Sequence, residues 1–366
     1  MIGSFKKNLP IIIHGAGFTG IHLAQKLWAL NIPFQLYEKS SHIGGLISEE
    51  TTPYGVIFKG PQSLLYKTNL NHLIPTKKFK KGFFFKNSFI SLPKCLFFFK
   101  SFQQIPQYSS AFDSLKNIFS EEEISLFIDP ILRSIFNEES KNLSGQILPK
   151  RIIHLLKSFF SLKSQESIDG FYHYLLKISQ PFHHQILFNK TFSEDFTKFN
   201  HFFCVPSYQA ANIIPDDSIK NILCSIPYSS VTQIHVFFEN NPLVFQDYEG
   251  ILNSSSEFYF TGVFKRKNYY IFFYGNDFCS DHFLQDIKNL GSKILYKHEQ
   301  TYSKAFPVYN SDFFSLQESL KKQKLSNSIF LGSFSSSPGL RSHLNQVHCD
   351  KLLEHLHLPL KDLAAL

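Results

Sequence analysis

The pattern of apolar and polar residues near the amino terminus predicts a strand, a helix and a second strand. Residues 11–13 form a short continuous apolar run bounded by turn residues, which is typical of a strand buried on both faces. Four apolar residues then recur at helical spacing, namely Ile21, Ala24, Leu27 and Trp28. Residues 34–38 are again strand-like. The chain is therefore expected to begin with a βαβ unit.

A glycine pattern lies between the first strand and the helix. Gly15, Gly17 and Gly20 form G-x-G-x-x-G, in which the first glycine allows a tight turn, the second lets a pyrophosphate approach, and the third brings helix and sheet together. The helix amino terminus then faces the phosphates. Glu38, at the end of the second strand, is placed to accept hydrogen bonds from ribose hydroxyls, which disfavours a 2′-phosphate. The pattern predicts a dinucleotide site and leaves NAD and FAD open.

The remaining pattern predicts helices before further strands. Residues 110–178 are helical in pattern, and Ser120 followed by three glutamates is a good helix start. An apolar stripe runs through Leu126, Ile128, Ile131, Leu132 and Ile135. Further strands are expected at 55–59, 186–192, 202–206, 231–238, 258–264, 269–274 and 329–331.

The composition fits a globular protein. Of the 366 residues, 43% are hydrophobic and 18% charged, which is ample for a packed core. The net charge is +8, but the basic residues are mixed with acidic ones, so no nucleic-acid partner is expected. The five cysteines and sixteen histidines show no metal-ligand spacing, which favours a reduced intracellular protein without a metal site. No apolar run approaches the roughly 20 residues of a membrane-spanning helix.

One segment leaves two interpretations open. Residues 67–105 are rich in Lys and Phe, a mixture that a membrane surface would favour. A hairpin with Phe in the core and Lys in solvent explains the same composition equally well. We therefore expect a cytoplasmic protein, with the cytoplasmic face of a membrane as the alternative location.

Two stretches after the glycine pattern make the chain similar to a known family. Residues 37–47, Y-E-K-S-S-H-I-G-G-L-I, and residues 55–65, G-V-I-F-K-G-P-Q-S-L-L, resemble the FAD-binding opening of the flavin amine oxidase superfamily. Within it, the chain most resembles the protoporphyrinogen oxidase family. That similarity rests on N-S-F-I-S-L-P at 87–93, I-D-P-I-L-R-S-I-F-N-E-E-S-K-N-L-S at 128–144, F-P-V-Y at 306–309 and I-F-L-G at 329–332.

The resemblance implies an α/β fold, α+β overall, with a Rossmann-like FAD-binding domain assembled from discontinuous segments, a mixed-sheet substrate domain and a helical lobe. The expected FAD-domain segments are 1–66, 183–212 (a strand and its return) and 323–366. A substrate-domain hairpin is expected at 67–106, the helical lobe at 107–182 and the substrate-domain sheet at 213–322.

The resemblance also implies a site for FAD. The expected cofactor contacts are Gly15, Ala16, Gly17, Phe18, Thr19, Gly20, Glu38, Gly44, Gly45, Leu46, Gly60, Pro61, Gln62, Ser63, Phe192, Ser333, Pro338, Gly339 and Leu340. Lys94, Phe97 and Lys100 are the expected substrate contacts. No catalytic side chain is expected, because in such enzymes the cofactor carries the reaction.

The implied reaction is FAD-dependent oxidation of protoporphyrinogen, or of coproporphyrinogen, to the porphyrin in haem synthesis. The expected partners are the porphyrinogen, molecular oxygen, and either a second copy or another haem-pathway enzyme. Two alternatives stay open. A UDP-galactopyranose mutase has a similar H-I-G-G element and about this length. A non-catalytic flavoprotein homologue would explain Ser337 and Ser342, which stand where the family usually has Gly and Asp.

Overall fold

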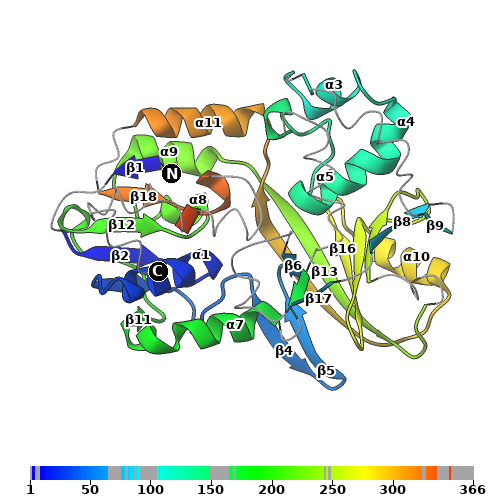
Figure 1. Cartoon of the computed structure of the whole chain (residues 1–366), viewed down its shortest axis with the longest axis horizontal. Coiled ribbons are helices and arrows are strands. Elements are labelled where there is room, and N and C mark those ends of the chain that lie inside the picture. Colours follow the sequence, from blue (N-terminus) through cyan, green and yellow to red (C-terminus); the bar gives the residue numbers. More distant parts are fainter. Residues whose placement is uncertain are drawn as a thin grey trace.

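In the computed structural model, the two largest sheets differ in construction and lie beside each other in Figure 1. The described residues are 2–4, 9–64, 76–78, 81–85, 88–90, 105–106, 108–148, 165–167, 170–242, 245, 249–323, 327–335 and 346–347.

The first sheet has six strands in the order β1-β18-β12-β2-β3-β11. These are β1 (Ile2–Ser4), β18 (Ser328–Phe330), β12 (Asn200–Phe203), β2 (Ile11–His14), β3 (Phe34–Tyr37) and β11 (Ile186–Leu187). Every neighbouring pair is parallel except β1 with β18, which is antiparallel. The strands come from the start, the middle and the end of the described chain, so the sheet is assembled from discontinuous segments, as the α/β prediction requires.

Helix α1 (Phe18–Ala29) follows β2 and packs on this sheet, which confirms the predicted βαβ order. All residues of β2 are buried, and Ile21, Ala24 and Leu27 of the predicted stripe have no exposed surface. Trp28, the fourth residue of the predicted stripe, is 39% exposed, so the prediction was wrong for this residue. The unit is thus held by apolar burial along the predicted helix face.

Helix α7 (Gly170–Ser179) differs from the expected domain layout. It falls within residues 107–182, the expected helical lobe, but packs on α1 beside the first sheet. The cause is its apolar face, because Phe171, Tyr174 and Leu175 join the same buried cluster as α1. The lobe seen in the structure therefore ends before α7.

The lobe itself consists of α3 (Ala111–Leu115), α4 (Glu121–Glu123), the π-helical turn η1 (Ile124–Ile128), α5 (Asp129–Phe136) and the 3₁₀ turn η2 (Gly145–Ile147). The predicted helix start is confirmed, since the Ser120 hydroxyl accepts from the Glu123 N–H while the Glu123 carboxylate accepts from the Ser120 N–H. Ile128, Ile131 and Leu132 of the predicted stripe are fully buried.

Two helices from the range expected for the substrate sheet cover the first sheet instead. These are α9 (Asp217–Ser225) and α11 (Ser311–Lys322), whose Leu223 and Leu320 share a buried cluster with Phe330 of β18. Figure 1 shows both helices above that sheet. The other short helices are η3 (Gln180–Gln185), η4 (Phe196–Lys198), α8 (Ser207–Ala210) and η6 (Ser333–Ser335).

The second sheet has seven strands in the order β17-β13-β16-β15-β14-β8-β9. These are β17 (Ile294–Pro307), β13 (Tyr228–Phe238), β16 (Tyr270–Tyr274), β15 (Gly262–Lys265), β14 (Gly250–Asn253), β8 (Lys81–Phe85) and β9 (Ser88–Ile90). Only β14 and β8 pair in parallel, so this is the expected mixed sheet. On β13, Ile234 and Val236 pack with Phe283 of α10 (Ser280–Leu290), which covers one face.

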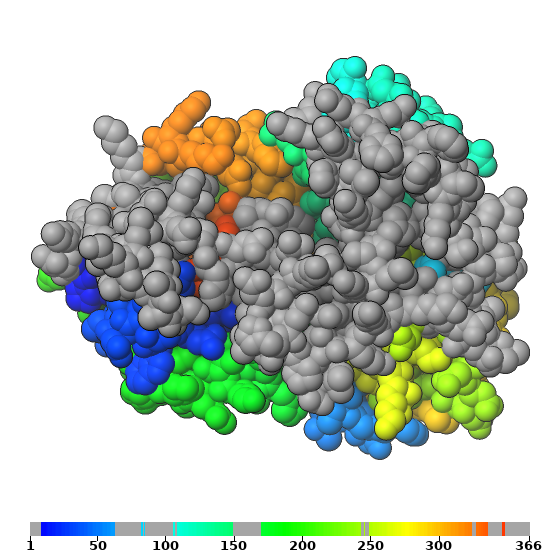
Figure 2. All heavy atoms as spheres, in the orientation of Figure 1, coloured from blue at the N-terminus to red at the C-terminus, as the bar shows by residue number. Residues whose placement is uncertain are grey.

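The opposite face of β13 meets the hairpin of β4 (Ser48–Thr52) and β5 (Gly55–Lys59). Ile57 of the hairpin packs with Phe237 and Ile271 of the sheet. In Figure 2 the hairpin, in blue, lies at the lower rim of the molecule. A small third sheet contains β6 (Ser63–Leu64), β10 (Gln165–Ser167) and β7 (Thr76–Lys78). Through Ile57, the β4–β5 hairpin joins the end of the amino-terminal segment to the mixed sheet.

The sequence pattern does not predict β14 or β17. Residues of β17 alternate between partly buried and exposed, and many are polar, because the strand lies at the edge of the sheet.

The part of the Lys- and Phe-rich segment that the structure describes includes Phe84, which is fully buried and packs edge-on against Phe258. For Phe84 the core interpretation therefore applies. No helix within the described ranges is both long and apolar enough to span a bilayer.

A buried histidine pair links β2 to β12. His201 Nε2 lies 2.9 Å from the Phe196 carbonyl, so that nitrogen carries the proton, and its Nδ1 accepts from His14 Nε2 at 2.9 Å. Burial lowers the pKa of His201 to about 4. The pKa of His14 lies well below its usual value, mainly because the ring is buried and secondly because a proton on His201 would repel a proton on His14.

We expect the free energy of unfolding to fall as the pH falls from 6.5 to about 4. In that window the unfolded chain binds a proton at His201 that the folded chain does not, at a full cost on the order of 3 kcal/mol. Above pH 6.5 the contribution is complete. Urea titrations across this range measure it. His201→Gln keeps one donor and one acceptor, so the variant should lose part of this pH dependence; an identical dependence in both proteins would contradict the account.

Candidate functional site

The first glycine turn brings the start of α1 against the end of β2. Gly15 has a φ of +94° and donates its N–H to the Tyr37 carbonyl at 2.8 Å. A Cβ on Gly20 would stand 1.9 Å from the Gly15 carbonyl oxygen. Only glycine therefore permits this approach of helix to strand, as the motif predicts.

The amino terminus of α1 is open to an anion. Gly17 is its N-cap, no side chain caps the helix, and its first turn contains no acidic residue. A Cβ on Gly17 would meet the Gly45 Cα at 3.9 Å, which is an ordinary van der Waals contact, so the second glycine turn leaves room for a small side chain here. The first-turn N–H groups and the helix dipole therefore suit a phosphate. Ala16, Phe18 and Thr19 are buried around this turn.

Glu38 follows β3 and reaches back to the same turn. Its Oε2 accepts from the Ala16 N–H at 2.7 Å, and its Oε1 accepts from the Ser40 N–H and hydroxyl at 2.8 and 2.7 Å. Each carboxylate oxygen can accept more than one hydrogen bond. The structure thus places the predicted ribose ligand beside the glycine turn, and its contact with a ribose stays a prediction.

A second glycine turn packs on the first. Gly44 donates its N–H to the Ala16 carbonyl at 2.8 Å and forms a bridge with Gly17. A Cβ on Gly45 would lie 3.3 Å from the Gly17 Cα. Leu46, also predicted, is 45% exposed beside it. The two turns therefore form one continuous backbone surface.

The third predicted turn continues this surface. Gly60 has a φ of +85°, and a Cβ there would stand 2.3 Å from the Leu46 carbonyl oxygen. Pro61 is partly buried and Gln62 is 6% exposed. The structure thus brings together three turns that the sequence separates by up to 45 positions, counting from Gly15 to Gly60.

Side chains of the mixed sheet hold the third turn. Gln233 of β13 accepts from the Gly60 N–H at 3.1 Å and donates to the Gly60 carbonyl at 2.9 Å. Gln62 donates to the same carbonyl at 2.8 Å, and its Oε1 accepts from Arg266 at 2.8 Å. Tyr302 of β17 also forms a hydrogen bond with the Gly60 backbone. Burial raises the pKa of its hydroxyl to about 12, and this hydrogen bond acts in the opposite direction.

The sequence reasoning missed Gln233, Arg266 and Tyr302. One local signal was available for Gln233, because it stands with His235 at alternate positions of a strand that is otherwise mainly apolar. Buried polar side chains in such a strand need partners across the interface. His235 has no exposed surface and donates through Nε2 to the Phe58 carbonyl at 3.1 Å, and burial lowers its pKa to about 4.

An ion-pair network lies beyond this contact. Glu50 of β4 accepts from Lys59 at 3.0 Å and from His298 of β17 at 3.1 Å. The hydrogen bond from Lys59 is the main cause of the lowered pKa of Glu50. The Lys59 contact joins the two strands of the hairpin, and the His298 contact links the hairpin to the mixed sheet.

The other predicted contacts are spread more widely. Phe192 is buried against Tyr37 and His14 rather than facing solvent. Ser333 follows Gly332, and its carbonyl accepts from the Tyr309 hydroxyl at 2.7 Å. Of Ser63, only the backbone is described, at the start of β6. Pro338, Gly339, Leu340, Lys94, Phe97 and Lys100 lie outside the described residues.

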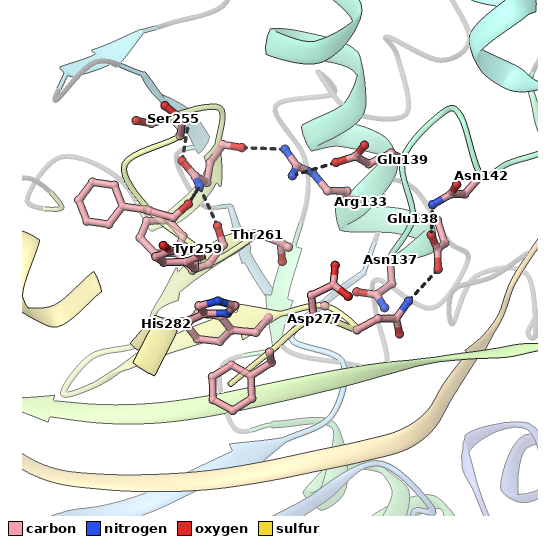
Figure 3. A pocket seen from close by; sticks show the side chains of 18 of the residues that line it. Arg133, Asn137, Glu138, Glu139, Asn142, Ser255, Tyr259, Thr261, Asp277 and His282 are labelled. Atoms are coloured by element: carbon pink, nitrogen blue, oxygen red, sulfur yellow. Dashed lines mark hydrogen bonds and ion pairs between the residues drawn. The ribbon is translucent and has the colours of Figure 1, made fainter. Parts of the chain in front are cut away.

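A separate cavity of about 860 Å³ lies between the end of α5 and the mixed sheet (Figure 3). The described residues that line it include none of the predicted site residues. Its charged side chains are mainly acidic, because Arg133 stands against Glu138, Glu139 and Asp277. These carboxylates would repel a pyrophosphate, so the cavity does not suit one. In Figure 3, the stacked rings of Tyr259 and His282 lie on one side of the cavity, and Glu138 lies on the other, where its carboxylate accepts hydrogen bonds from Asn142 and Asn276.

No group of three metal-ligating side chains occurs among the residues that the structure describes. The chemistry available at the glycine turns is instead that of binding an extended anionic dinucleotide. The helix terminus supplies donors for phosphate, Glu38 supplies an acceptor for hydroxyls, and the turns supply a continuous stretch of backbone without large side chains.

Comparison with known proteins supports the fold. The sequence matches no protein-family model and no curated relative. Among solved structures, a reduced UDP-galactopyranose mutase is similar with a TM-score of 0.73 at 12% identity, covering 95% of this chain and 94% of that one. A proposed protoporphyrinogen oxidase from Exiguobacterium sp. 255-15 has a TM-score of 0.70 at 12% identity, with 96% and 99% covered.

A fatty acid isomerase from P. acnes that produces CLA is also similar, with a TM-score of 0.71 at 12% identity, covering 96% of this chain and all of that one. The chain thus has the same overall fold as these structures, which confirms the predicted fold class. Because the neighbours differ in activity, the fold alone does not fix the reaction.

Two alanine substitutions should separate folding from cofactor binding. Gly20→Ala forces a Cβ into the Gly15 carbonyl oxygen, so we expect about 2 kcal/mol or more of lost stability. Gly17→Ala has room for its Cβ and a φ of −72°, so it should fold normally but obstruct a phosphate. Its FAD dissociation constant should rise about tenfold or more, equivalent to 1.4 kcal/mol.

Urea titration and fluorescence titration with FAD measure the two effects. The site assignment would be wrong if Gly17→Ala bound FAD as tightly as the unmodified protein.

Proposed function

We propose that this protein is an FAD-dependent oxidoreductase that oxidises a porphyrinogen, protoporphyrinogen or coproporphyrinogen, to the porphyrin. The observation that carries the proposal is the contact of three glycine turns with one another, between the acid Glu38 and the buried face of the mixed sheet. Such a continuous backbone surface fits a long dinucleotide.

The order of these turns along the site predicts which way round FAD would bind. Glu38 would hold the adenosine ribose, and the amino terminus of α1 at Gly17 would hold the pyrophosphate. The second and third turns lead from there to Gly60 and the mixed sheet. The flavin end would therefore lie toward Gly60 and Gln62, where the substrate domain meets the cofactor domain.

The chain's own residues would bind and orient the reactants. Bound FAD would supply two-electron oxidation with oxygen as the final acceptor, and three such oxidations account for the six electrons that separate a porphyrinogen from its porphyrin. The buried sheet face with Gln233 and His235 would exclude water from the third turn. The substrate assignment is supported by the ordered similarity to the protoporphyrinogen oxidase family and by the structural neighbour proposed to have that activity.

A spectroscopic experiment tests this function. The purified protein should show flavin absorption bands that bleach when protoporphyrinogen is added without oxygen and return with air. Porphyrin fluorescence should then rise faster than in a control without protein, because the enzyme outpaces autoxidation. Coproporphyrinogen, added in a parallel reaction, identifies the preferred substrate. Flavin bands that neither porphyrinogen bleaches would exclude the proposed reaction.

A mutase is the second candidate, favoured by the TM-score of 0.73 to UDP-galactopyranose mutase over 95% of this chain. A reduced flavoprotein that interconverts the two ring forms of the sugar nucleotide would establish it. A yellow protein inactive with the sugar nucleotide and with both porphyrinogens would favour the third alternative, a non-catalytic flavoprotein homologue.

A further inference from the structure

Gln233 makes a two-point contact with the third glycine turn. Its side-chain amide accepts from the Gly60 N–H at 3.1 Å and donates to the Gly60 carbonyl at 2.9 Å. The contact joins β13 to a turn 173 positions earlier, and Gln233 is only 4% exposed. A buried glutamine is costly unless its amide is paired, and here both of its atoms are.

The Gly60 turn has a backbone conformation that favours glycine. Gly60 has a φ of +85°, and a glycine loses more conformational freedom on folding than other residues do, so contacts that fix this conformation oppose that loss. Its other backbone contacts are to Gln62, which shares the Gly60 carbonyl at 2.8 Å, and to the Tyr302 hydroxyl. Gln233 is thus the side chain that contacts both the donor and the acceptor of this residue.

The position of Gly60 is transmitted to the rest of the site. The turn abuts Leu46, directly after Gly44 and Gly45, and those two glycines pack on Gly17. A displacement of Gly60 away from Gln233 would therefore open the backbone surface at the end farthest from Glu38. The opposite end would keep its own contacts, because Glu38 bonds to Ala16 and Ser40.

We propose that Gln233 is a positioning residue, which holds the Gly60 turn in the one conformation that receives the flavin end of FAD. This inference rests on the proposed cofactor. Without the amide, the turn samples other conformations, and FAD binds only the fraction of molecules in which the turn has the conformation that Gln233 otherwise holds. The apparent dissociation constant then rises in inverse proportion to that fraction.

The test compares two substitutions of similar size with a matched control. Gln233→Met removes both hydrogen bonds, and Gln233→Glu keeps an acceptor for the Gly60 N–H but places a second acceptor against the Gly60 carbonyl. The control is Gln300→Met on the neighbouring β17. Gln300 pairs directly across from Gln233, but its described side-chain contact is a 3.3 Å hydrogen bond to the Thr301 carbonyl.

Hydrogen exchange on the protein without FAD measures the turn directly. We expect the peptide that contains Gly60 to exchange at least tenfold faster in both Gln233 variants, with the peptide that contains Gly15 and Gly20 unchanged. Fluorescence titration should give an FAD dissociation constant at least tenfold higher. The visible circular dichroism of the bound flavin should change, which a general loss of stability would not cause well below the melting temperature. Gln300→Met should match the unmodified protein in all three measurements.

The outcomes separate this inference from the proposed function. Unchanged exchange at Gly60 in Gln233→Met would overturn the positioning role, whatever the cofactor. Faster exchange with unchanged FAD affinity and flavin spectrum would overturn the link between the turn and the flavin. If the unmodified protein bound no FAD, the proposed function would fail and the inference with it, whereas the exchange data would still decide whether Gln233 holds the turn.

Discussion

The close approach of backbone to backbone at the glycine turns is the constraint on which the rest of this structure depends. Gly20 lies so near the Gly15 carbonyl that no Cβ fits between them, and this contact sets where α1 begins. With α1 fixed there, its uncapped amino terminus faces the second turn at Gly44. Each later contact of the site, through Leu46 to Gly60, builds on that first approach.

The two sheets meet where these turns end. The β4–β5 hairpin carries the chain from the second turn to the third and packs Ile57 against the mixed sheet. Polar side chains on β13 then complete the contact, because Gln233 and His235 satisfy backbone groups of Gly60 and Phe58. A cofactor lying along the turns would therefore end at the domain boundary, where a substrate can reach it.

Features set by neighbouring residues could be predicted from the sequence. The βαβ unit, the tight glycine turn after its first strand and the helix start at Ser120 follow from short-range spacing, and the structure confirms all three. The position of α7 could not be read in the same way, because its apolar face would suit either the lobe or α1. Strand β17 was missed because an edge strand needs few apolar residues.

Contacts between distant residues left little local signal. Gln233 and Gly60 are 173 positions apart, and His14 and His201 are 187 apart, so nothing in either neighbourhood reveals the partner. Most of the predicted glycines of the site meet a local requirement that a sequence motif can record, such as the positive φ of Gly15, Gly44, Gly45 and Gly60. The residues that hold those glycines obey no such rule, and several residue types could serve in their place.

A crystal structure of the protein purified with FAD tests the central claim most directly. The account predicts the pyrophosphate at the amino terminus of α1 beside Gly17, the adenosine ribose at Glu38, and the flavin ring toward Gly60 and Gln62. FAD bound elsewhere, for example in the acidic cavity beside Arg133, or a cofactor lying in the reverse direction along the turns, would contradict it.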